Sequence, residues 1–130
     1  MIVDTSVIIA LLRNEPDASA ISEALENAAV CRISAVTYVE ASVVTDSNRD
    51  PILSRRFDDL LKDVRMRIEP VTATQAELAR QAYRDFGKGR HKAGLNLGDC
   101  FAYALAKDMS EPLLFKGDDF CHTDVGPAER

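Results

Sequence analysis

The segment from Leu97 to Lys107 constrains the fold most, because at helical spacing it is apolar almost all round. A helix of this kind is normally buried, so the rest of the chain must cover it. Asp99 interrupts the apolar surface near the start of the segment. Asn96 is a good helix cap, and an acid at the third helical position can close a capping box. On this segment alone, Asp99 is either a helix cap or part of a functional site.

Composition narrows the class of protein. At 130 residues, with 46% apolar and 28% charged residues, the chain has the size and balance of one globular domain, which we expect to span 1–130. No apolar run approaches the roughly 18 residues of a membrane span, and no basic segment precedes the apolar start. Three scattered cysteines and two histidines argue against a disulfide framework, a zinc site or a Ser-His-Asp triad. We therefore expect a cytoplasmic protein with reduced thiols and no membrane partner.

Short apolar segments alternate with helical patterns along the chain. The expected strands are 1–3, 30–34, 66–71 and 113–116. The expected helices are 7–13, 15–29, 35–46, 51–65, 72–86 and 97–107, and we expect the tail from 121 to 130 to fray. This alternation predicts an α/β fold, with a small, mostly parallel sheet of four to five strands between helices on both faces.

Acidic residues follow the first and the last expected strand. Asp4 comes directly after the first, and Asp118 and Asp119 come after the last. In a parallel sheet, the carboxyl ends of the strands and the starts of the following helices lie along one edge, which would bring these acids near Asp99. Carboxylates gathered there would repel one another unless a divalent cation neutralised them, and oxygen ligands suit Mg²⁺ or Mn²⁺. A helix cap at Asp4 and a Gly-Asp turn at Asp118 are the structural alternatives.

Glu40 adds a further acid from the expected third helix. It projects into the stripe formed by Val36, Val39, Val43 and Val44, which we expect to be buried. A carboxylate on a buried stripe needs a cation or hydrogen-bond donors. A functional site, a buried ion pair and a misplaced helix edge all remain open for Glu40.

Positive charge is concentrated ahead of the central helix, although the net charge of the chain is −5. One acid, Asp85, stands among five cations, which are Arg80, Arg84, Lys88, Arg90 and Lys92. These residues form either a solvated helix face or a strip that contacts phosphates.

Four segments together resemble the PIN-domain family, and more narrowly the VapC toxins of type II toxin–antitoxin pairs. They are Ile2-Val3-Asp4-Thr5-Ser6, Glu40, the run 95–100 (LNLGDC) and the run 113–120 (LLFKGDDF). The resemblance covers the whole chain in order and spacing. It implies an endoribonuclease that depends on Mg²⁺ or Mn²⁺, forms a homodimer, and is inhibited by a VapB-type antitoxin whose C-terminal segment occupies the active-site groove.

The resemblance also implies roles for individual residues. Asp4 and Asp99 match the family's metal ligands, and Glu40 matches its third acid. Asp118 and Asp119 both stand where the family places the fourth acid, and of these Asp118 is favoured for reaching the metal and Asp119 for shaping the adjacent turn. Smaller roles fall to a hydroxyl at Thr5 or Ser6, to the polar neighbour Asn96, and to Arg90 and Lys92 as substrate-binding residues of a basic rim. In this chemistry water attacks phosphorus with the help of the metal, without a protein nucleophile, and leaves 5′-phosphate and 3′-hydroxyl ends.

Three other classes of protein share part of this pattern. A haloacid-dehalogenase-type phosphatase expects an acid where Ser6 stands. A phosphoacceptor receiver domain expects paired acids after its first strand and an acceptor aspartate after a middle one, where this chain has a lone Asp4 and Ser34. A PIN domain that binds RNA without cleaving it is the third alternative, although all the family acids are present.

Overall fold

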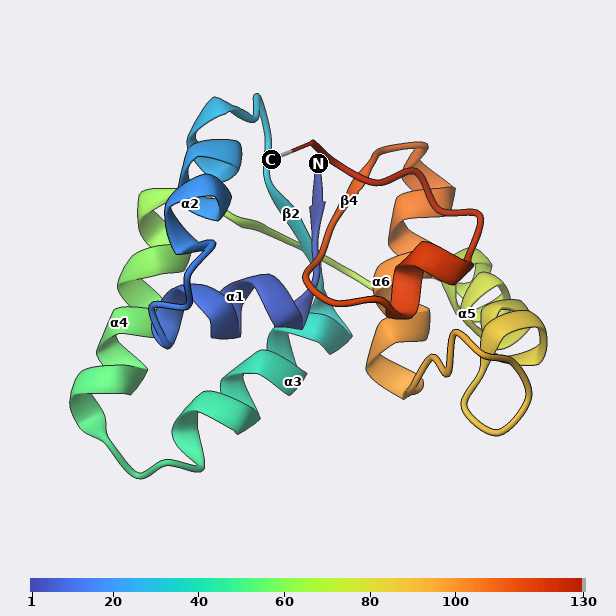
Figure 1. Cartoon of the computed structure of the whole chain (residues 1–130), viewed down its shortest axis with the longest axis horizontal. Helices are drawn as coiled ribbons and strands as arrows, with labels where there is room; N and C mark the ends of the chain where they lie inside the picture. Colours follow the sequence, from blue (N-terminus) through green and yellow to red (C-terminus); the bar gives the residue numbers. More distant parts are fainter. Residues whose placement is uncertain (130) are drawn as a thin grey trace.

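A four-stranded parallel sheet runs through the computed structural model, which describes residues 1–129 (Figure 1). The strand order is β3-β2-β1-β4, with Ile2 in register with Arg32 on one side and Leu113 on the other. The strands are β1 (Ile2–Val3), β2 (Arg32–Ser34), β3 (Arg67–Glu69) and β4 (Leu113–Leu114). The expected α/β fold with a small parallel sheet is confirmed.

Helices lie on both faces of this sheet (Figure 1). They are α1 (Thr5–Leu12), α2 (Ala18–Asn27), α3 (Ala35–Asp46), α4 (Pro51–Asp63), α5 (Ala73–Phe86), α6 (Leu97–Met109) and the short 3-10 helix η1 (Asp119–His122). The bounds of α3 are those expected from sequence, whereas α2 and α4 are shorter than expected and α6 is longer. Asp50 caps α4 through Ile52 N, and Thr72 caps α5 through Gln75 N.

Two apolar cores form because successive strand residues point to opposite faces. Ile2 and Leu113 pack with α5 and α6, whereas Val3 and Leu114 pack with α1, α2 and α4. Within the first of these cores, α6 is buried along most of its length, and between Gly98 and Ala106 only Phe101 is partly exposed. The strong prediction of a buried helix is therefore confirmed.

The exposed side of α3 corrects one prediction. Val39 is 56% exposed and Val43 is 61% exposed, so the valine stripe does not face the core. The buried face of α3 carries Thr37, Ala41 and Thr45 instead. Short side chains let α3 approach its neighbours closely, and Thr45 satisfies its hydroxyl on the Ala41 carbonyl at 2.8 Å.

The expectation of a frayed tail is also wrong for the residues that the structure describes. Leu113 N donates to Gly126 O at 2.8 Å, and Ala128 N donates to Leu113 O at 2.8 Å. The tail thus extends the sheet beside β4. Backbone hydrogen bonds hold the tail in place, and the polar composition of the tail does not predict them. Arg130 lies outside the described residues.

Candidate functional site

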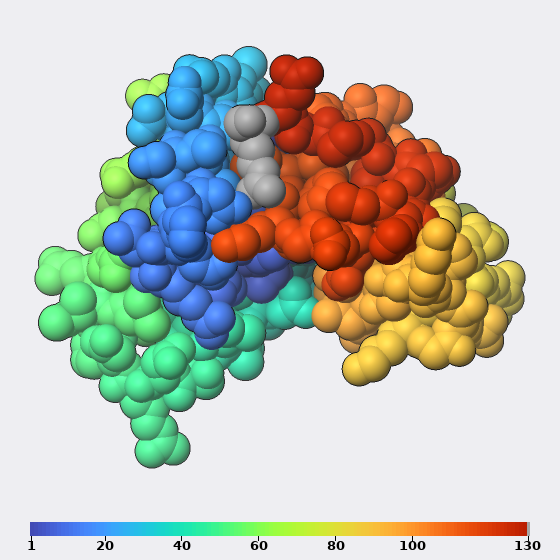
Figure 2. Space-filling model, viewed as in Figure 1, coloured from blue at the N-terminus to red at the C-terminus, as the bar shows by residue number. Residues whose placement is uncertain are grey.

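Acids from four separate elements line a pocket of about 330 Å³ at the carboxyl edge of the sheet. Asp4 follows β1, Glu40 comes from α3, Asp99 comes from the first turn of α6, and Asp119 comes from η1. Figure 2 shows the molecule hollowed on this side, between α3 in teal and the yellow-to-orange segment that leads into α6. The other lining residues are Thr5, Ser6, Val44, Asn96, Lys116 and Phe120.

Asp4 is buried, with 4% of its surface exposed, and it caps α1. Its Oδ2 accepts hydrogen bonds from Ser6 N at 3.1 Å and from Ser6 Oγ at 2.7 Å. Its Oδ1 is buried and has no hydrogen-bond partner among residues 1–129. Burial raises the pKa of Asp4, against the hydrogen bonds from Ser6 that lower it. Asp4 is therefore both a helix cap and a carboxylate with one oxygen left for a ligand.

Glu40 is held by a hydroxyl from the first residue of α1. Thr5 Oγ1 donates to Glu40 Oε1 at 2.6 Å. The carboxylate lies directly against Gly98, where an added Cβ would stand only 2.1 Å from Oε2. Because Gly98 has no side chain, the start of α6 leaves room for the Glu40 carboxylate at this position.

Asp99 closes the capping box that the sequence suggested. Asn96 Oδ1 accepts from Asp99 N at 2.8 Å, and Asp99 Oδ2 accepts from Asn96 N at 3.0 Å. Burial is the main cause that raises the pKa of Asp99 to about 7, and repulsion from Asp4, Asp119 and Glu40 adds to it. The cap is therefore confirmed, and it fixes Asp99 in the pocket among the other acids.

The two acids after β4 are placed differently. Asp119 lines the pocket, and its charge contributes to the raised pKa of Asp99. Asp118 is exposed at the N-terminal boundary of η1 and is absent from the pocket lining. Phe120 is buried and packs 5.2 Å from Phe115 between ring centroids, which anchors this turn. The sequence favoured Asp118 for the metal, whereas the structure brings Asp119 to the other acids.

Arg90 and Lys92 lie outside the acid pocket, on an exposed loop between α5 and α6. The Arg90 guanidinium stands 5.1 Å from the centroid of the Tyr83 ring. The loop is turned by Gly89 (φ 82°) and Gly94 (φ 62°), two backbone positions with the positive φ that favours glycine.

Two residues at or beside the pocket, Lys116 and Gly98, had no role assigned from sequence. Gly98 was named only as part of the run 95–100. Its close approach to Glu40 is a contact between α3 and α6, which are far apart in the chain. Lys116 follows β4, donates from its backbone N to Ser6 Oγ at 2.9 Å, and pairs through Nζ with Glu15 and with Asp17, the latter at 3.0 Å. The position of Lys116 after an apolar strand does not by itself predict any of these contacts.

The acid pocket fits a hard cation in its chemistry. Its acids supply only oxygen donors, and the buried Oδ1 of Asp4 lacks a partner within the described chain. As they stand, however, no three or more His, Cys, Asp or Glu side chains of residues 1–129 are grouped so that they could hold a metal ion. Instead, Glu40 accepts a hydrogen bond from Thr5, Asp4 accepts from Ser6, and Asp99 accepts from the backbone N of Asn96.

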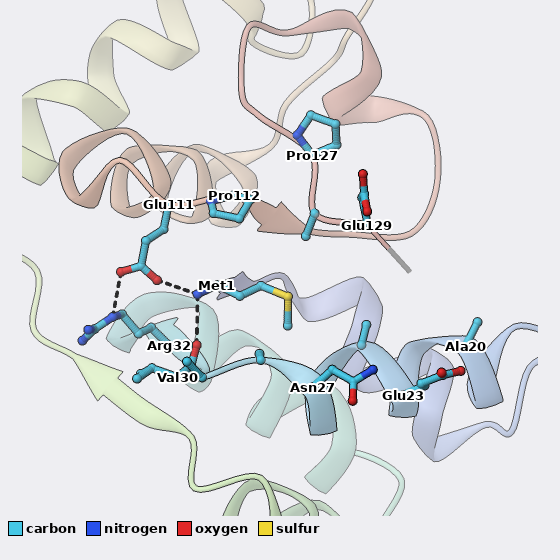
Figure 3. A pocket seen from close by; sticks show the side chains of 14 residues that line it. Met1, Ala20, Glu23, Asn27, Val30, Arg32, Glu111, Pro112, Pro127 and Glu129 are labelled. Carbon is cyan, nitrogen blue, oxygen red and sulfur yellow. Dashed lines mark hydrogen bonds and ion pairs between the residues drawn. The ribbon is translucent and has the colours of Figure 1, made fainter.

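A larger cavity lies elsewhere, at the amino ends of the strands, with a volume of about 970 Å³ (Figure 3). Three charged groups at its wall, from Met1, Arg32 and Glu111, pair with each other. The Met1 amine donates to Val30 O at 3.0 Å and pairs with Glu111, and Arg32 Nε donates to Glu111 Oε2 at 2.9 Å. These pairings link β1, β2 and the start of β4, so the groups of this wall have a structural role.

Comparison with known proteins identifies the family. The PIN domain model matches residues 1–126. VapC ribonuclease Mb0625 of Mycobacterium bovis is 59% identical over 126 residues, which are 96% of this chain and 95% of that protein. Ribonuclease VapC42 of Mycobacterium tuberculosis is 50% identical over 129 residues, 98% of each chain. The chain therefore belongs to the PIN-domain family, within its VapC group.

Solved structures agree with the fold. The crystal structure of Mycobacterium tuberculosis VapC20 superposes with a TM-score of 0.75 at 17% identity, covering 99% of this chain and 98% of that one. A toxin–antitoxin complex from Klebsiella pneumoniae gives 0.73 at 21% identity, with the same coverage. The expected family is confirmed, and the receiver-domain and phosphatase alternatives are set aside. Within residues 1–129, every helix is too short or too polar to cross a membrane.

Proposed function

We propose that this protein is the toxin of a VapBC-type pair and hydrolyses RNA phosphodiester bonds as a metal-dependent endoribonuclease. The observation that carries the proposal is the convergence of Asp4, Glu40, Asp99 and Asp119 from four elements on one small pocket. Four acids at the carboxyl edge of a parallel sheet cost stability, so they call for a function. The names of the relatives at 45% to 59% identity describe ribonucleases, which supports the same activity.

Mg²⁺ or Mn²⁺ is the proposed cofactor. Asp4, Asp99, Glu40 and Asp119 would hold it, and Asp4 offers the buried oxygen that has no other partner in the described chain. When bound, the cation supplies charge neutralisation among the acids and activation of water near the phosphodiester. We assign the fourth acid to Asp119 in place of Asp118, because only Asp119 lines the pocket.

The remaining site residues either position the acids or contact the substrate. Ser6 fixes the Asp4 carboxylate, Thr5 fixes that of Glu40, and Asn96 fixes that of Asp99. Arg90 and Lys92 are the proposed contacts to substrate phosphates at the rim, where cations offset the repulsion between an acidic pocket and a polyanion.

The family and the exposed residues also suggest a homodimer, an antitoxin partner and a cellular compartment. We propose a homodimer in which Val39 and Val43, one helical turn apart and both exposed, meet their copies on a second chain. A VapB-type antitoxin is the proposed inhibitor, and solved relatives of this fold include toxin–antitoxin complexes. The cytoplasm is the proposed compartment, since Cys31, Cys100 and Cys121 are all free thiols.

The test is cleavage of a mixed RNA pool by purified protein in Mg²⁺, in Mn²⁺ and in chelator. An Asp99→Asn variant prepared in parallel controls for contaminating ribonuclease. We expect cleavage that requires metal and is lost in the variant, and products with 5′-phosphate and 3′-hydroxyl ends. Equal cleavage by both proteins would refute the assignment of the site. Tight RNA binding without cleavage would favour a domain that only binds RNA.

A further inference from the structure

A second groove lies beside the acid pocket, between α5 and the first turn of α6. It has a volume of about 580 Å³, within the range of small-ligand sites. Ala79, Leu95 and Cys100 form its buried apolar floor. Asn96 lines both the groove and the acid pocket, so the two hollows adjoin.

The charge of this groove is opposite to that of the acid pocket. Arg80 and Lys88 line it, and no carboxylate does among the described residues. Its rim also exposes large apolar groups, with Leu97 at 74% exposed and Tyr83 at 43%. The groove therefore suits a ligand that is anionic on one side and flat and apolar on the other.

The Tyr83 ring is held in place before any ligand binds. Gly87 packs so closely against it that an added Cβ would lie 2.5 Å from Cδ1. The Arg90 guanidinium stands over the ring at 5.1 Å from its centroid. A ring fixed in this way loses little freedom on binding, which favours stacking.

We propose that this groove binds one nucleotide of the RNA strand next to the phosphodiester that is cleaved. The base lies against Tyr83 and Leu97, and the phosphate lies against Arg80 and Lys88. Charge complementarity and continuity with the acid pocket through Asn96 select an RNA strand as the occupant. The inference rests on the proposed ribonuclease function and adds to it a subsite that reads a base beside the bond that is cut.

The test measures RNA affinity separately from cleavage. Fluorescence anisotropy in chelator reports binding of a labelled single-stranded RNA pool of roughly 12 nucleotides. Leu97→Ala is compared with Ile52→Ala, which removes a leucine-sized side chain that is 73% exposed on α4, away from the groove. Arg80→Ala is compared with Arg56→Ala, an exposed cation on α4.

Tyr83→Ala is compared with Tyr83→Phe, which keeps the ring. We expect Tyr83→Ala to weaken binding at least about fivefold and Tyr83→Phe to retain most of it. Leu97→Ala should weaken binding about threefold or more. Arg80→Ala should lower the salt dependence of binding by about one charge. Ile52→Ala and Arg56→Ala should leave affinity and salt dependence close to those of the wild type.

Three results would overturn the proposal, each in a distinguishable way. Unchanged affinity in the Leu97, Tyr83 and Arg80 variants, with wild-type cleavage intact, would refute the subsite and leave the ribonuclease standing. A change of oligomeric mass in Leu97→Ala without loss of RNA affinity would assign the groove to a protein contact instead. Wild-type protein that neither binds nor cleaves RNA would refute both the subsite and the proposed function.

Discussion

Replacing Asp99 by Asn separates the catalytic interpretation of this residue from the capping one. Asp99 is 8% exposed, and its pKa is raised from 3.8 to about 7 by burial and by the neighbouring acids. The folded protein therefore holds this proton more tightly than the unfolded chain, so stability is lost as pH rises from 3.8 through about 7. At pH 8 this difference in pKa lowers the unfolding free energy by about 4 kcal/mol. At pH 5 the loss is less than half as large.

Asparagine removes this cost and keeps an oxygen that can accept from Asn96 N. It loses the favourable interaction of a charge with the start of α6, about 0.3–1 kcal/mol. In chelator at pH 8, Asp99→Asn should therefore be more stable than the wild type by about 3 kcal/mol, with a smaller difference at pH 5.

Urea unfolding of both proteins at pH 5 and pH 8, in chelator and in Mg²⁺, measures these differences. Added Mg²⁺ should stabilise the wild type and leave the variant nearly unchanged, because ligands stabilise the state that binds them. A variant that is less stable than the wild type at pH 8 in chelator would show that the charged cap at the start of α6 outweighs the cost of burying the Asp99 carboxylate beside other acids. That result would refute the expected destabilisation by the ionised Asp99.

Three further predictions concern single contacts. Gly98→Ala should displace the Glu40 carboxylate and lower cleavage at least about tenfold, while urea unfolding shows a change below about 1 kcal/mol, because alanine suits a helix. Val43→Asp should give a monomeric mass in light scattering, and a dimeric mass would move the interface away from α3. The double variant Arg90→Ala and Lys92→Ala should weaken RNA binding and reduce its salt dependence by up to about two charges, whereas an unchanged slope would leave the loop as solvated surface.

Much of the fold was open to prediction from local patterns. The near-continuous apolar surface of α6 required burial, and the bounds of α3 were recognised from its flanking residues. The aspartates were recognised from their places after strands and at a helix start, and Glu40 was recognised from its place within the third helix. Periodicity fails where short side chains pack tightly. Helix α3 buries Thr37, Ala41 and Thr45 and exposes three of its four valines, because close packing between helices favours small residues over larger apolar ones.

By itself, the sequence determined which elements form and which carboxylates stand at their ends, since both depend on residues close together in the chain. Only the tertiary structure decided which of Asp118 and Asp119 reaches the pocket, because the buried ring of Phe120 sets how the turn after β4 lies. It also decided that Gly98 makes room for Glu40, a contact across 58 positions of the chain between α3 and α6. Both outcomes depend on packing between segments that are far apart in the chain. A local pattern of residues does not predict such packing.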